Sequence, residues 1–128
     1  MPKAKELAIR CENLPGALAH IARVLGDAKV NILAFLTTTS GTEGTVQVVV
    51  DNENRAKKAL ASTGLSYVEA DVLQVELPNL PGALGSFAGK LASKDINIIS
   101  GYLTTVKGSK KASMILAVSD LGEAARVR

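Results

Sequence analysis

A long internal repeat constrains the fold of this chain more than any other feature of its sequence. Residues 13–39 read NLPGALAHIARVLGDAKVNILAFLTTT and residues 79–105 read NLPGALGSFAGKLASKDINIISGYLTT; at a constant offset of 66, twelve of these 27 positions are identical without a gap. Both segments have mixed composition, which excludes low-complexity bias as the cause. A duplication is the simplest explanation, so the fold must accommodate two copies of one small unit.

Hydrophobic periodicity gives each copy the same order of elements. In the first copy we expect a strand at 7–11, a helix at 18–25, a strand from 30, a strand at 45–50 and a strand from 65 onward. Between the last two strands, Asp51-Asn52 offers an N-cap for a helix that runs to about Ser62. Pro15 and Pro81 suit the first turn of the first helix in each copy, where a missing N–H costs nothing. This order predicts an α+β fold of two tandem ferredoxin-like (βαββαβ) units, with antiparallel sheets and the helices on one face.

Two irregularities concern the boundary between the units, which we place at residues 1–71 and 72–128. No Gly or Pro interrupts Leu65–Leu77, so the last strand of the first unit is expected to run directly into the first strand of the second. A helix is expected to begin near Asp120, and the second unit would then lack its last strand. Because native proteins normally cover an open strand edge, we expect the other half of the chain or another subunit to pair with it.

Composition limits the classes of function. Of 128 residues, 47% are hydrophobic and the formal charge is only +3, as in ordinary globular proteins. Cys11 and His20 are single residues of their types, so we expect no disulfide, no metal site and no cofactor. Cys11 is expected to be a half-buried small hydrophobe, and His20 to face solvent or a neighbouring helix. No apolar run is long enough to span a bilayer and the first residues do not form a signal peptide, so we expect a cytoplasmic protein without membrane contact.

The motif Asn-Leu-Pro-Gly-Ala-Leu, with Val/Ile-Asn-Ile further along each copy, resembles the ACT domain family over residues 5–128. The family also includes free-standing tandem proteins, and this chain looks like one of those. It implies a regulatory module of the kind attached to enzymes such as phosphoglycerate dehydrogenase and aspartokinase, with a free amino acid bound where two modules meet. The residues implied to bind this ligand are Asn13, Gly16, Ala17, Leu18, Asn31 and Ile32 in the first unit, and Asn79, Gly82, Ala83, Leu84, Asn97 and Ile98 in the second.

These residue types also suit an amino-acid zwitterion on chemical grounds. The start of a helix offers unpaired N–H groups to a carboxylate, and an Asn side chain offers both a donor and an acceptor. A Gly before the helix lets the backbone approach a ligand closely. Other roles remain open, because Asn13 and Asn79 also suit a helix cap, and Asn31 and Asn97 also suit a left-handed turn.

The two copies depart from the family pattern in ways that bear on the ligand. Lys29 and Asp95 stand where many family members have Gly before the second motif, and Asp tolerates the backbone of such a turn better than Lys. Glu12 precedes the motif in the first copy, whereas Pro78 precedes it in the second. Whether both sites take the same ligand is therefore open. The basic residues Lys107, Lys110 and Lys111 are expected to form a solvated loop.

The leading hypothesis is a regulatory protein that senses a free amino acid and signals to a partner by a change in packing. We expect a homodimer, with a biosynthetic enzyme or a regulator as a further partner. The alternative is a ligand-free ACT scaffold that mediates oligomerisation with such an enzyme. Nucleic-acid binding is not expected, because residues 45–50 and 113–118 carry no aromatic side chains on which bases could stack. No catalytic residues are recognisable, so we do not expect an enzyme.

Overall fold

The expected α+β fold is present, and the structure, a computed structural model, describes residues 3–127. The elements in chain order are β1 (Lys3–Glu12), α1 (Ala17–Asp27), β2 (Ile32–Ser40), β3 (Glu43–Val50), α2 (Glu53–Ser62), β4 (Tyr67–Pro78), α3 (Ala83–Ser93), β5 (Ile98–Thr104), β6 (Lys111–Val118) and α4 (Leu121–Ala124). Hydrogen-bonded neighbours follow the order β2-β3-β1-β4-β6-β5. The ladders β1–β3, β2–β3, β4–β6 and β5–β6 are antiparallel.

Two compact units share the chain, and each boundary between them falls inside a strand. The first unit is Lys5–Ala70, and the described residues of the second are Lys3, Ala4 and Asp71–Val127. The expectation that no break separates residues 65–77 is confirmed, because β4 runs from Tyr67 to Pro78. Within the second unit, β4 lies between β6 and β1 in the strand order. The edge that the sequence leaves open is therefore next to the strand that begins the chain, and no strand follows α4 as far as Val127.

The core of the first unit lies where its two helices pack on β1 and β3. Leu7 and Ile9 alternate along β1, and Ile21 and Leu25 lie one turn apart on α1; all four are at most 1% exposed. The helix α2 begins as expected, since the Oδ1 atom of its N-cap Asn52 accepts a hydrogen bond of 3.0 Å from the backbone N–H of Arg55. Apolar residues at strand and helix spacing thus form one buried layer.

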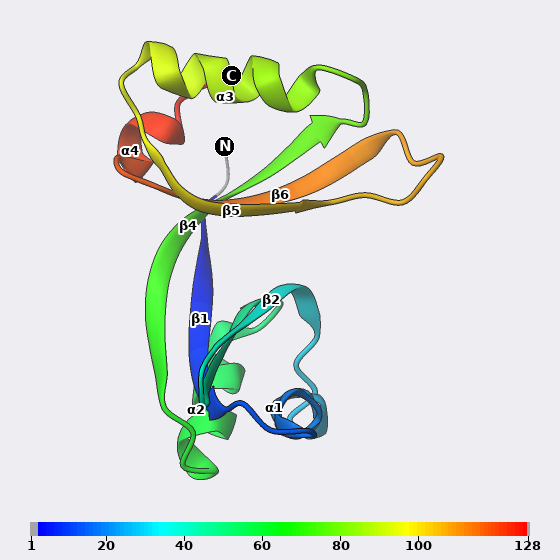
Figure 1. Ribbon diagram of the computed structural model, residues 1–128, viewed down its shortest axis with the longest axis vertical. Helices are drawn as coiled ribbons and strands as arrows, with labels where there is room; N and C mark the ends of the chain where they lie inside the picture. Colours follow the sequence, from blue (N-terminus) through cyan, green and yellow to red (C-terminus); the bar gives the residue numbers. More distant parts are fainter. Residues whose placement is uncertain (1–2, 128) are drawn as a thin grey trace. The chain divides into compact units, whose positions relative to one another are not determined.

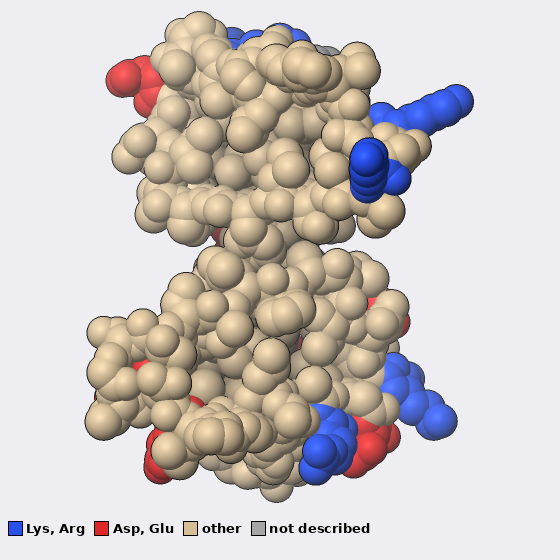
Figure 2. Space-filling view, turned by 45° about the vertical axis from the view of Figure 1, so that its right-hand side comes forward, with Lys and Arg blue, Asp and Glu red and all other residues tan. Residues whose placement is uncertain are grey.

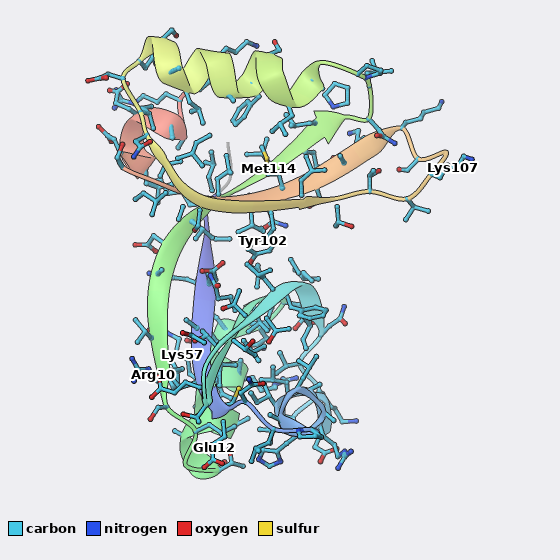
Figure 3. All side chains as sticks on the ribbon, in the orientation of Figure 1. Arg10, Glu12, Lys57, Tyr102, Lys107 and Met114 are labelled. Atoms are coloured by element: carbon cyan, nitrogen blue, oxygen red, sulfur yellow. The ribbon has the colours of Figure 1, made fainter. Side chains whose placement is uncertain are left out.

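The second unit repeats this packing with its own helix. Figure 1 shows α3 covering one face of the strands β4, β5 and β6. Phe87 and Leu91 of α3 pack in one buried cluster with Leu73 of β4 and Met114 of β6. In Figure 3, Met114 lies on the α3 side of the sheet and Tyr102 on the opposite side. None of the helices between residues 3 and 127 has the length and hydrophobicity that crossing a bilayer requires.

Candidate functional site

The Leu-Pro-Gly segment forms a tight turn that delivers the chain to α1. The carbonyl of Leu14 accepts a hydrogen bond of 3.2 Å from the N–H of Ala17, and Gly16 has φ 90° and ψ −8°. Proline at the second position and a positive φ at the third define a type II turn. The expectation that Pro15 lies in the first helical turn is wrong, because the left-handed Gly16 separates Pro15 from the helix.

The second copy forms the same turn before α3. The carbonyl of Leu80 accepts from the N–H of Ala83 at 3.2 Å, and Gly82 has φ 87° and ψ −10°. Neither α1 nor α3 has a side-chain cap. Because Ala17 and Ala83 use their N–H groups within the turns, the free donors at the helix starts belong to the next two residues, Leu18 and Ala19 in α1 and Leu84 and Gly85 in α3.

Asn13 and Asn79 hold a hairpin in place and do not cap the helix. The backbone N–H of Asn13 donates to the carbonyl of Thr42, and its Nδ2 donates to that of Gly41, both at 2.9 Å. Asn79 bonds in the same two ways, to Lys110 at 3.0 Å and to Ser109 at 2.9 Å. Within the described part of the chain, both Oδ1 atoms lack a hydrogen-bond donor, so they remain available as acceptors.

Asn31 and Asn97 are fixed by their backbones and leave their side chains exposed. The N–H of Asn31 donates to Oδ1 of Asp51 at 2.9 Å, and its carbonyl accepts from the N–H of Asp51 at 3.0 Å. Asn97 makes the equivalent pair with Ser119, at 2.8 and 2.9 Å. Neither side-chain amide bonds to another residue in the range that the structure covers, and both residues are exposed. Each amide therefore has its full bonding capacity free.

The left-handed conformation that these Asn residues could adopt falls two positions earlier. Lys29 has φ 60° and Asp95 has φ 59°, and between residues 3 and 127 no other residue except glycine has a positive φ. These are the positions where the family pattern has Gly, so the two departures seen in the sequence retain the backbone conformation of a glycine. Among the other expected ligand residues, Ile32 packs against the core of the first unit, whereas Ile98 is 36% exposed.

Within one unit the two Asn positions lie at opposite ends of a strand. Asn31 immediately precedes β2, whereas Asn13 is bonded to Gly41, immediately after it. Nine residues of strand separate them, which corresponds to about 30 Å at the usual rise per residue. Asn79 and Asn97 are separated in the same way by β5. A single small molecule therefore cannot contact both Asn side chains of one unit.

An open groove of about 790 Å³ lies beside Asn13 in the first unit. It is lined by the end of β1, the β2–β3 hairpin and the segment 64–66, and of the twelve expected ligand residues it contains Asn13 alone. Its charged residues are Arg10, Glu12 and Glu43, and Figure 3 shows Arg10 and Glu12 on β1. These three residues were not expected from the sequence, because their types and spacing match no binding motif.

Asp51 and Ser119, which were not expected from the sequence, anchor Asn31 and Asn97. A constant offset of 66 does not align Asp51 with Ser119, because they are related by an offset of 68. Aligning the hydrophobic pattern of β3 with that of β6 would have revealed the match. The expectations for the isolated residues are confirmed, since Cys11 is half-buried and His20 exposed. No group of His, Cys, Asp and Glu over residues 3–127 is arranged to hold a metal ion.

Comparison with known proteins relates this fold to one family. The family model described as ACT domain matches residues 5–62. No curated protein sequence matches the chain. A crystal structure of a protein from Bacteroides thetaiotaomicron is similar with a TM-score of 0.90 and 26% identity, over 96% of this chain and 84% of that one.

Two solved structures with lower identity share the fold. The regulatory subunit of aspartate kinase from Thermus thermophilus, in its ligand-free form, has a TM-score of 0.69 and 16% identity, over 97% of this chain and 88% of that one. The same subunit from Thermus flavus has a TM-score of 0.62 and 19% identity, over 96% and 87%. The match at residues 5–62 covers β1, α1, β2, β3 and α2. Residues 5–62 of this chain therefore match the ACT domain family.

Proposed function

We propose that this protein binds a free amino acid at the Leu-Pro-Gly corner and regulates a partner protein through the resulting change in packing. The observation that carries the proposal is the corner itself, where the N–H groups of Leu18 and Ala19 at the start of α1 have no acceptor among the described residues. The same corner occurs before α3, and we extend the proposal to the second unit as a further ACT module. We expect no catalytic role for either unit.

Each polar group of an amino acid has a counterpart at this corner. The N–H groups of Leu18 and Ala19, at the positive end of the α1 dipole, suit the α-carboxylate. The free Oδ1 of Asn13 suits the ammonium group, because it is a neutral acceptor. Gly16 has no neighbouring atom within 4 Å of the place of a Cβ, so the approach is open. Leu14, which is 59% exposed, supplies an apolar contact for the ligand's side chain.

The amide of Asn31 must then come from a second module. Since Asn13 and Asn31 of one unit lie about 30 Å apart, they can hold one ligand only if two modules place the end of one strand beside the start of another. Two such strands would run antiparallel. The strands β2 and β5 are the two ends of the strand order and carry exposed apolar residues such as Phe35 at 51% and Ile99 at 66%. Exposed edges of this kind readily pair with another strand.

The partner in this proposal is an enzyme or regulator of amino-acid metabolism. Its support is the fold shared with the regulatory subunits of aspartate kinase from the two Thermus species. In such a pair, an amino acid bound between modules would stabilise one arrangement of their edges, and a docked partner would respond to that arrangement. Because β2 and β5 are opposite ends of the strand order, the edge that completes the proposed site comes from a second chain, so the proposed active form is at least a homodimer.

Thermal unfolding in the presence of each of the twenty amino acids tests the proposal. A ligand at about 100 times its Kd should raise the free energy of unfolding by about 2.7 kcal/mol. Asn31→Ala should reduce that gain, and Asn31→Ala with Asn97→Ala should abolish it. The unliganded protein should be unchanged, because neither side chain makes a hydrogen bond to residues 3–127. Asn54→Ala, at an exposed position of α2, is the matched control and should retain the gain.

Two results would contradict the proposal. One is the absence of stabilisation by any of the twenty amino acids. The other is a stabilisation that survives Asn31→Ala and Asn97→Ala together, since a ligand held elsewhere would not need either amide. A chain that associates with its partner enzyme and binds no amino acid would instead support the ligand-free scaffold.

A further inference from the structure

The hairpin between β5 and β6 differs from its counterpart between β2 and β3. The partners of Asn79, Ser109 and Lys110, are offset by 68 from those of Asn13, whereas the Asn residues are offset by 66. The second hairpin is therefore two residues longer. Its tip carries Val106, which at 75% is the most exposed of the large apolar side chains between residues 3 and 127.

This longer hairpin ends in a hydrogen-bonded turn and is basic. The carbonyl of Val106 accepts from the N–H of Ser109 at 2.9 Å, and Gly108 has φ 89°, so a further type II turn forms the tip. Lys107 lies at the end of this hairpin in Figure 3, and basic side chains project from the upper body in Figure 2. Lys111 pairs with Glu76 at 3.2 Å, whereas Lys107 and Lys110 have no ion pair within the described range.

The groove beside Asn13 has the opposite character. Glu12 and Glu43 are directly opposite each other in the β1–β3 ladder, and like charges in such a pair repel. Neither carboxylate forms an ion pair with a residue in positions 3–127. Arg10 also lines the groove, so two carboxylates and one guanidinium leave a net negative charge. The groove also contains the exposed side chain of Leu14.

We infer that the Val106 hairpin of one chain docks into the acidic groove of a second copy of this chain. Lys107 and Lys110 would neutralise the carboxylates of Glu12 and Glu43, and Val106 would bury its apolar surface against Leu14. The hairpin and the groove are thus complementary in charge and in hydrophobicity. The equivalent corner of the second unit cannot serve as the groove, since Pro78 and Lys111 there stand opposite each other where the first unit has Glu12 and Glu43.

A second copy fits the hairpin better than a nucleic acid does. Phosphate contacts would use the lysines but would leave Val106 in water, and the hairpin has no aromatic side chain for base stacking. The Glu12–Glu43 pair, in turn, gains positive charge in addition to that of Arg10, which leaves the groove with a net negative charge. The contact uses no residue of β2 or β5, so it does not require the edge pairing proposed above. It shares Leu14 with the proposed ligand contact, so its test is run without amino acids.

Charge reversal with rescue by mixing tests this contact. Two variants are needed, E12K/E43K with a basic groove and K107E/K110E with an acidic hairpin. Mass measurements by sedimentation equilibrium at low salt, without amino acids, should show that the wild-type chain self-associates and that each variant does so at least tenfold more weakly. An equimolar mixture of the two variants should recover association, because each variant then meets the opposite charge, and salt should weaken it. R55E/K58E, which makes the same net change on α2, should behave as the wild type.

Circular dichroism of each variant shows whether the fold is retained, which is expected because all four residues are exposed. Three results would overturn the inference: a wild-type chain that stays monomeric at low salt, a mixture that does not regain association, or a control weakened as much as K107E/K110E. Binding of a short DNA duplex that is lost in K107E/K110E, in a chain that does not self-associate, would assign the hairpin to a polyanion instead. Failure of the amino-acid panel leaves this test unaffected.

Discussion

At the scale of single residues, both copies place a residue other than glycine where the backbone is left-handed. Lys29 and Asp95 each hold the chain in a left-handed turn, with φ near 60°. In that region the Cβ of an L-residue lies too close to the following carbonyl, at a cost of about 1 to 2 kcal/mol, and Asp is penalised less than Lys. A glycine would remove the strain, but it would lose more conformational entropy on folding than lysine or aspartate does.

Lys29→Gly should therefore raise the free energy of unfolding by about 0.5 to 1 kcal/mol, once the entropy of glycine is offset against the relieved strain. Asp95→Gly should give a smaller gain. Lys58→Gly, in the exposed middle of α2, provides the control and should lose about 1 kcal/mol. Urea unfolding at equilibrium measures all three variants, and a loss of stability in Lys29→Gly would show that the lysine side chain contributes more than its backbone costs.

At Gly16, replacing the glycine should lower stability, whereas introducing a glycine at Lys29 should raise it. Its φ of 90° penalises any L-residue, while no atom lies within 4 Å of the added Cβ, so the whole cost of Gly16→Ala comes from the backbone. We expect a loss of about 1 to 2 kcal/mol. Gly26→Ala, inside α1 and equally free of neighbours, should instead gain about 0.5 to 1 kcal/mol. Thermal unfolding measures both variants, and midpoint temperatures that change in the same direction would contradict this prediction.

At the scale of elements, periodicity was sufficient to predict the secondary structure but not its connections. Alternation along β1 and the spacing of Ile21 and Leu25 arise from burial on one face, which leaves a direct record in the sequence. The type II turn was missed because a Pro-Gly pair fits both a turn and a helix start, and only the φ of Gly16 distinguishes them. The role of Asn13 was missed because its partner Gly41 is 28 residues away, and side-chain contacts over such distances leave no periodic pattern.

The hydrogen bond from the Asn13 side chain to the β2–β3 hairpin should make substitution of Asn13 more destabilising than substitution of Asn31. Asn13→Ala removes the bond from Nδ2 to the Gly41 carbonyl, which should lower the free energy of unfolding by about 1 kcal/mol. Asn31→Ala removes a side chain without bonding partners and should change it by less than about 0.5 kcal/mol. Amide hydrogen exchange should also show faster opening of residues 40–43 in Asn13→Ala alone. Equal effects of the two substitutions would mean that the hydrogen bond from Asn13 to Gly41 contributes nothing to stability.

At the scale of the whole molecule, the boundaries between the two units do not lie at the ends of the repeated sequence. The strand β4 contains Ala70, in the first unit, and Asp71, in the second, so one strand continues through both. The chain's first strand does the same between Ala4 and Lys5. Sequence patterns could not reveal this sharing, because Lys3 and Ala4 precede the repeat and their neighbours in space are nearly 70 residues away in the chain.

A chain that begins at Lys5 should therefore lose stability in the second unit, although the deletion removes residues next to the first. Lys3 and Ala4 belong to the second unit, where β1 is the neighbour of β4, and each ladder hydrogen bond lost should cost about 1 kcal/mol. Hydrogen exchange should become faster at residues 71–78, with β3 and α2 of the first unit as internal controls. Faster exchange confined to the first unit would mean that the open edge of β4 does not depend on the start of the chain.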